Sequence, residues 1–135
     1  MIILDTHSLI WLMEGDKKIK PYLPKIKNAQ KKGGIIISNI SIWELAMLES
    51  RGRISLNTDI KKWVNTCLNL QGIKLQEITP EIAIDSCNLP DNFHGDPADR
   101  IISSSARILN AKLLTFDKEI LKYAKKGHLK VVSTD

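Results

Sequence analysis

The chain has 135 residues, of which 43% are hydrophobic and 26% are charged, as in one ordinary globular domain. This hydrophobic share, with a net charge of only +5, excludes an intrinsically disordered chain. The longest apolar runs, such as residues 35–37, are far shorter than the ~20 residues that a membrane-spanning helix needs. The N-terminus lacks the basic start of a signal peptide, and two cysteines make no disulfide framework. We therefore expect a single domain over residues 1–135 in the reducing cytoplasm.

Short aliphatic runs alternate with longer helical patterns along the chain. In chain order, the sequence predicts strand 1–4, helix 5–13, helix 17–32, strand 35–37, helix 41–52, helix 57–70, strand 73–78, helix 80–89, helix 97–111, strand 112–115, helix 118–126 and strand 129–132. Strands separated by helices need crossover connections, so they pair in parallel and are covered on both faces. The pattern predicts a three-layer α/β/α fold with a mostly parallel sheet of about five strands.

Acidic residues stand where predicted strands pass into helices. Asp5 directly follows the first strand, and Asp117 follows the strand at 112–115. Glu44 is expected in the first turn of the helix after the second strand, and Asp99 in the first turn of the helix at 97–111. Ligands of an open parallel sheet bind outside the carboxyl ends of its strands. These four acids are therefore candidate site residues.

Helix capping explains each acid singly, because carboxylates near helix N-termini meet unpaired N–H groups. Ser41 and Glu44 have the spacing of a capping box. Asp96 and Asp99 have the spacing of an N-cap with an acid at the third helical position, and Pro lies between them. The other candidate caps are Asp5, Thr6 and Asp117. Capping alone is thus an alternative to a ligand site.

Several carboxylates at one sheet edge would repel one another unless a cation neutralises them. Oxygen ligands from carboxylates suit Mg²⁺, with Mn²⁺ as a substitute, and no His or Cys pair has the spacing of a zinc site. His94 is expected as a hydrogen-bonding loop residue, and His7 could approach the acids. The acid cluster therefore predicts a magnesium site.

A carboxylate-held Mg²⁺ in a basic protein indicates phosphodiester chemistry, with an acid outside the coordination shell as a possible general base. Lys and Arg side chains would then hold the nucleic-acid backbone. Arg100 is the cation best placed to touch a phosphate, although it could instead pair with Asp96. The lysines that are expected to form a solvated helix face are Lys18, Lys25, Lys31 and Lys32.

The motifs DTH, SIWEL, HGDPADRIISSSA and LLTFD, in that order, resemble those of the PIN domain, and within it the VapC-like toxins of bacterial toxin–antitoxin pairs. The resemblance runs along the whole chain, and HGDPADRIISSSA is its most specific segment. By this resemblance Asp5, Glu44, Asp99 and Asp117 are the acidic quartet that holds Mg²⁺ or Mn²⁺ for RNA cleavage.

The resemblance has further implications for residues and partners. Asp96 matches an additional acid, an auxiliary ligand or a cap, and Thr6 and Thr115 match hydroxyls that hydrogen-bond beside the acids. It implies an endoribonuclease that acts on RNA, forms a homodimer and is inhibited by a cognate VapB-like antitoxin. The short apolar runs, independently of the resemblance, predict no membrane partner.

Two other functions remain open at the level of sequence. An aspartate-based phosphatase or phosphotransferase would share the α/β sheet, but it usually has a second Asp where this chain has His7. A basic α/β module that binds nucleic acid or a protein partner without catalysis would use the acids only as caps. A shift of the unfolding temperature with Mn²⁺ identifies a metal-binding carboxylate cluster, because a protein whose acids serve only as caps should show no shift.

Overall fold

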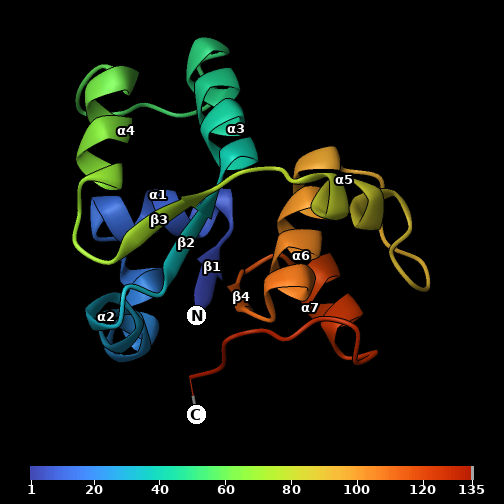
Figure 1. Cartoon of the computed structure of the whole chain (residues 1–135). Helices are drawn as coiled ribbons and strands as arrows, with labels where there is room; N and C mark the ends of the chain where they lie inside the picture. The colour runs from blue at the N-terminus through green and yellow to red at the C-terminus, as the bar shows by residue number, and fades with distance from the viewer. Residues whose placement is uncertain (135) are drawn as a thin grey trace.

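The computed structural model describes residues 1–134; Asp135, the last residue of the predicted domain, lies outside the described residues. Four strands form one parallel sheet in the order β3-β2-β1-β4 (Figure 1). The strands are β1 (Ile2–Leu4), β2 (Ile35–Ser38), β3 (Ile73–Gln76) and β4 (Lys112–Leu114). The helices are α1 (Thr6–Glu14), the 3₁₀ helix η1 (Lys17–Tyr22), α2 (Leu23–Lys31), α3 (Asn39–Ser50), α4 (Ile60–Leu68), α5 (Pro80–Cys87), α6 (Pro97–Leu109) and α7 (Lys118–Ala124).

The alternation of side chains along the strands builds a core on each face of the sheet. Ile2 and Leu4 of β1 pack with buried residues of α1, η1, α2 and α4 on one face. Ile3 of the same strand packs on the other face with buried residues of α6 and α7. Figure 1 shows these two helix groups on opposite sides of the strands. The predicted three-layer α/β/α architecture with a parallel sheet is confirmed.

The strand count differs from the prediction. The segment expected as a fifth strand, at residues 129–132, makes a single parallel bridge between Val131 and Leu113. Two backbone hydrogen bonds link it to β4, from Leu113 N to Lys130 O and from Val132 N to Leu113 O, both 2.9 Å long. Beyond them the chain runs to α2, where Lys25 donates to the carbonyl of Ser133. The pairing therefore ends before it becomes a strand.

The lysine-rich segment at residues 17–32 is also wrong as a single helix. Residues Lys17–Tyr22 form a 3₁₀ turn with Pro21 inside it, and α2 begins at Leu23 with Pro24 in its first turn. Each proline lacks the backbone N–H that a continuous α-helix would need at that position. In residues 1–134 none of the helices combines the length and hydrophobicity needed to span a bilayer.

Candidate active site

A cavity of about 350 Å³ opens at the carboxyl edge of the sheet, where β1, β2 and β4 end. Its lining residues are Asp5, Thr6, His7, Trp11, Glu44, Asp96, Asp99, Phe116 and Asp117. The structure thus brings the four predicted quartet acids and the auxiliary acid to one cavity. They come from the starts of α1, α6 and α7 and from α3, which are far apart in sequence.

Asp5 is the most buried of these acids, with 7% of its surface exposed. Its Oδ1 accepts a hydrogen bond of 2.8 Å from Ser8 N, which caps α1. Its Oδ2 accepts from the Thr115 hydroxyl, and the Thr115 Oγ1 accepts in turn from Asp117 N at 3.1 Å. Thr115 therefore connects the side chain of one acid to the backbone of another, beside the cavity.

Two further acids, Asp96 and Asp117, each cap a helix and also line the cavity. Asp96 Oδ1 accepts from Asp99 N at 3.0 Å and begins α6. Asp117 Oδ1 accepts from Glu119 N and Ile120 N and begins α7. Within the part of the chain that the structure describes, the second oxygen of each carboxylate has no protein hydrogen bond. The predicted caps therefore leave one oxygen of each acid available to a ligand.

Asp99 is in contact with His94, whose Nε2 lies 2.8 Å from Asp99 Oδ2. Burial raises the pKa of Asp99 from its ordinary 3.8 to about 6, and the hydrogen bond from His94 opposes this shift. The negative charges of Asp96 and Asp117 contribute to the same rise of the Asp99 pKa. Asp96 and Asp117 are therefore both close enough to repel the Asp99 carboxylate. His94, expected as a loop hydrogen-bonder, binds a site acid.

Glu44 reaches the cavity from a different helical position than expected. The helix α3 begins at Asn39 and its N-cap is Ser38, whose hydroxyl accepts from Ile40 N at 3.2 Å. Glu44 thus lies in the second turn, and the prediction that it lies in the first turn of a helix opened by Ser41 is wrong. Ser38 and Ser41 both have the side chain of an N-cap, and the cap falls where the strand ends.

Thr6 also lines the cavity, but its hydroxyl does not bind an acid. It donates to Ser41 Oγ at 3.1 Å, and both residues are buried. This bond joins α1 to α3, which carries Glu44. Of the two hydroxyls that the resemblance puts beside the acids, Thr115 contacts a carboxylate and Thr6 fixes the helix next to it.

Arg100 does not line the cavity. Its Nε donates to Ser86 O at 2.8 Å, and its Nη1 donates to Phe93 O and His94 O at 3.0 and 3.1 Å. In residues 1–134 it makes no ion pair with Asp96. The guanidinium therefore ties the loop before α6 to the end of α5, and the expected phosphate contact stays a prediction.

An aromatic side of the cavity is the feature that sequence reasoning missed. Trp11 and Phe116 both line it, with ring centroids 5.0 Å apart and edge-on to one another. His7 lies 6.0 Å from Trp11, and Tyr22 packs edge-on against Phe116 at 5.3 Å. Trp11 stands six residues after the site acid Asp5, and Phe116 directly precedes Asp117. Their closeness in sequence to two site acids was the signal that could have suggested these rings at the cavity.

The donor set has the chemistry of an Mg²⁺ or Mn²⁺ site. Five carboxylates line the cavity and no cysteine does, which suits hard cations that prefer oxygen. Within residues 1–134, however, no three His, Cys, Asp or Glu side chains are gathered as a metal-binding group. The caps hold Asp5 and Asp117, and His94 holds Asp99. Metal binding would therefore require carboxylate side chains to turn toward one another.

Comparisons with known proteins agree with this geometry. The chain is 28% identical over 120 residues, 88% of each sequence, to the protein named Ribonuclease VapC22 of Mycobacterium tuberculosis. Its fold is similar to that of VapBC2 from Rickettsia felis bound to a promoter DNA fragment, with TM-score 0.71, 19% identity and 98% of both chains covered. It is also similar to a toxin–antitoxin complex from Klebsiella pneumoniae, with TM-score 0.67, 22% identity and coverage of 100% of this chain and 98% of the other.

The pattern of the PIN domain matches residues 2–126, which include every acid of the cavity and all four strands. With the match extending over nearly the whole chain, this protein belongs to the PIN domain family.

Proposed function

We propose that this chain is an Mg²⁺- or Mn²⁺-dependent endoribonuclease, the toxin of a cytoplasmic toxin–antitoxin pair. The observation that carries the proposal is the convergence of five carboxylates, from four separate segments, on one cavity of a PIN domain. The name of the M. tuberculosis relative supports RNA as the substrate. The titles of the R. felis and K. pneumoniae structures support an antitoxin as the partner.

The residues that would hold the cation are Asp5, Glu44, Asp99 and Asp117, with Asp96 as an auxiliary ligand. When bound, Mg²⁺ would lower the pKa of a water molecule and stabilise the charge that develops on the scissile phosphate. The protein's own contribution is to orient the acids by hydrogen bonds, from Thr115 to Asp5 and between His94 and Asp99. Second contacts of this kind fix ligand direction and typically change metal affinity or activity 10- to 100-fold.

We further propose that the chain forms a homodimer. Two large apolar side chains support this: Trp43 of α3 is 58% exposed and Ile84 of α5 is 66% exposed. Aromatic side chains such as Trp are enriched at interfaces between subunits.

The test is the cleavage of total cellular RNA by the purified chain with Mg²⁺, with Mn²⁺ and with EDTA, beside Asp99→Asn. We expect discrete fragments only with metal and only from the wild type. Mn²⁺ should also raise the unfolding temperature of the wild type more than that of Asp99→Asn, because binding stabilises the folded state.

The opposite result would favour a different function. With neither cleavage nor a shift of the unfolding temperature, the acids are helix caps and the chain is a binding module without catalysis. The hydrogen bonds by which Asp5, Asp96 and Asp117 cap their helices are the observation in favour of that second function.

A further inference from the structure

The acid cavity contains no Lys or Arg among its lining residues. An RNA backbone that enters it meets five carboxylates, and a divalent cation offsets that repulsion only at the phosphate it contacts. The phosphates on either side need protein cations at the edge of the cavity. Arg100 does not line the cavity, and its Nε and Nη1 bind three backbone carbonyls, so we looked for another cation at the cavity wall.

Lys18 is held against a residue of the cavity wall. Its Nζ lies 4.4 Å from the centroid of the Trp11 ring, and Trp11 lines the cavity together with Asp5 and Asp117. An ammonium within about 6 Å of an indole face is attracted by the negative charge of the π-system. Lys18 is exposed, as expected of a lysine on a solvated helix face, and its ammonium lies against a ring that lines the cavity.

The local backbone sets this position. Gly15 ends α1 with a φ of 69°, a left-handed conformation that reverses the chain without side-chain strain. Asp16 N then donates to Trp11 O at 2.9 Å, and the Asp16 side chain accepts from Lys18 N at 2.9 Å. The first turn of η1 is thereby folded back on α1. Phe116 braces the indole edge-on, so the ring that supports Lys18 is itself fixed.

The charge of Lys18 is not neutralised within the protein. In residues 1–134 no carboxylate lies at ion-pair distance from its ammonium. The indole occupies one side of a group that carries three N–H donors, so donors remain for a phosphate. Because the long side chain is already held by the ring, less conformational entropy is lost when it binds.

We propose that Lys18, seated on Trp11, binds an RNA phosphate that neighbours the scissile one at the acid cavity. The proposal rests on the proposed ribonuclease function and adds to it a phosphate-binding residue and the aromatic side chain that positions it. The contact is with the backbone, so it strengthens RNA binding without regard to base sequence.

The first experiment measures binding of a short fluorescein-labelled single-stranded RNA in EDTA, by anisotropy, over a series of salt concentrations. Lys18→Gln should weaken binding about fivefold and lower the slope of log K against log salt by about 0.7, the value for one phosphate contact on a single strand. Lys18→Arg should restore both values, because the charge is kept.

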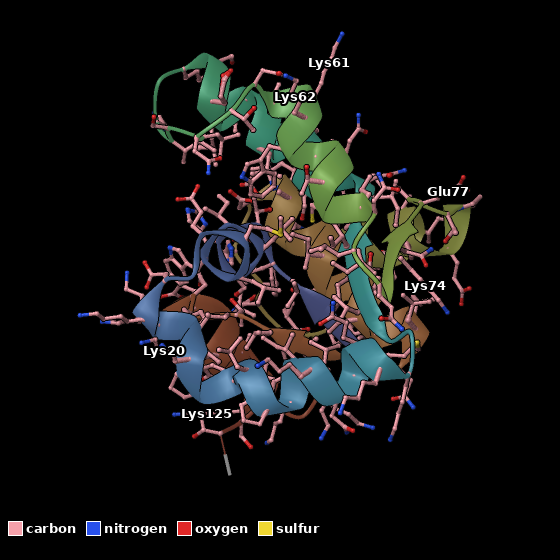
Figure 2. All side chains as sticks on the ribbon, turned by 90° about the vertical axis from the view of Figure 1, so that its left-hand side faces the viewer. Lys20, Lys61, Lys62, Lys74, Glu77 and Lys125 are labelled. Atoms are coloured by element: carbon pink, nitrogen blue, oxygen red, sulfur yellow. The ribbon has the colours of Figure 1, made fainter. Side chains whose placement is uncertain are left out.

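Two lysines provide matched controls. Lys61 of α4 points outward from the molecule (Figure 2), and Lys61→Gln, which removes the same charge, should leave affinity and slope unchanged. Lys20 lies on η1, two residues from Lys18, and is exposed. If Lys20→Gln weakens binding as much as Lys18→Gln does, the whole basic segment acts diffusely and the proposal is wrong. An unchanged salt slope in Lys18→Gln also overturns it.

Trp11 is tested by a double-mutant cycle. If the ring positions Lys18, Trp11→Leu and Lys18→Gln together should weaken binding no more than the larger single change. Additive losses would mean that the ring does not act through Lys18. Unfolding temperatures identify any variant that fails to fold. If Trp11→Leu does not fold, the Lys18 variants still test the phosphate contact, because Lys18 is exposed and its replacement should not disturb folding.

Cleavage kinetics with Mg²⁺ separate this proposal from the one on which it rests. Lys18→Gln should raise KM about fivefold and leave kcat nearly unchanged, as expected for uniform loss of substrate binding. If the wild type neither binds nor cuts RNA, the ribonuclease function fails. If the wild type cuts RNA and Lys18→Gln does so with the same KM, only the role of Lys18 fails.

Discussion

The hydroxyl group of Thr115 connects two acids of the site by hydrogen bonds. The residue is 4% exposed, donates to Asp5 and accepts from the backbone of Asp117. A buried carboxylate that loses such a partner is free to rotate and is left partly without hydrogen bonds.

Replacing Thr115 should therefore impair catalysis although its side chain does not itself line the cavity. We expect Thr115→Val to lower kcat/KM about 10- to 100-fold and to cost about 1–3 kcal/mol of unfolding free energy. Cleavage rates and urea unfolding measure the two effects. Thr115→Ser, which keeps the hydroxyl, should stay near the wild type in both, and a fully active Thr115→Val would disprove the positioning role.

Thr115 stabilises the folded chain, whereas the ionised Asp99 carboxylate destabilises it. Its pKa is about 6 in the folded chain and 3.8 ordinarily, so the folded state holds the proton more tightly than the unfolded chain does. The free energy of unfolding therefore falls as the pH rises from about 4 to about 6, where the buried carboxyl ionises.

Asp99→Asn should remove that cost together with the activity. In EDTA above about pH 7 we expect it to be more stable than the wild type by about 1–3 kcal/mol, with the difference fading toward pH 4. Urea unfolding across this pH range measures it. Glu77→Gln, at an exposed acid that points away from the molecule (Figure 2), is the matched control and should show no such pH-dependent gain.

At the scale of elements, helix starts determine most of the site. Asp5, Asp96 and Asp117 were recognisable in sequence because an N-cap has a defined residue type and a defined place after a strand or before a proline. Glu44 was predicted as a site residue from an incorrect helix start. The sequence suggested Ser41 as the N-cap, whereas Ser38 caps the helix. The aromatic side could not be predicted, because it depends on how η1 folds back on α1.

The loop before α6 depends on Arg100. The three carbonyls that its guanidinium binds belong to α5 and to the segment that carries His94, the partner of Asp99. A fork of donors at fixed angles can satisfy all three, whereas a lysine ammonium cannot reproduce that geometry.

Arg100→Lys should accordingly act as a structural change. We expect a loss of about 2 kcal/mol in unfolding free energy and a weaker effect of Mn²⁺ on the unfolding temperature, because His94 and Asp99 lose their support. The salt slope of RNA binding should match the wild type. A slope lowered by about 0.7 with intact stability would instead establish the phosphate contact that the sequence suggested.

For the whole molecule, the sequence pattern predicted three layers and a parallel sheet because both follow from the alternation of apolar strands with helices. The predicted fifth strand failed for a reason outside that pattern. Hydrophobicity at Leu129 and Val132 reflects burial against the two cores, which requires no strand pairing beyond the single bridge at Val131.

The proposed homodimer would depend on apolar side chains at the surface of the folded chain. Trp43 is exposed on α3 next to Glu44, whose side chain lines the cavity on the same helix. We expect sedimentation velocity to give twice the chain mass of 15.2 kDa for the wild type, and Trp43→Ser to shift the population toward the monomer. Trp43→Phe should keep the dimer, because an aromatic ring remains.

Such an interface would connect assembly to catalysis. A dimer contact at Trp43 would restrain the helix that presents Glu44, so the specific activity of the wild type should fall on dilution below the dissociation constant. Trp43→Ser should show the lower activity at every concentration while its unfolding temperature, extrapolated to low concentration, equals that of the wild-type monomer. A wild type that sediments as a monomer at high concentration would exclude both the dimer and this coupling.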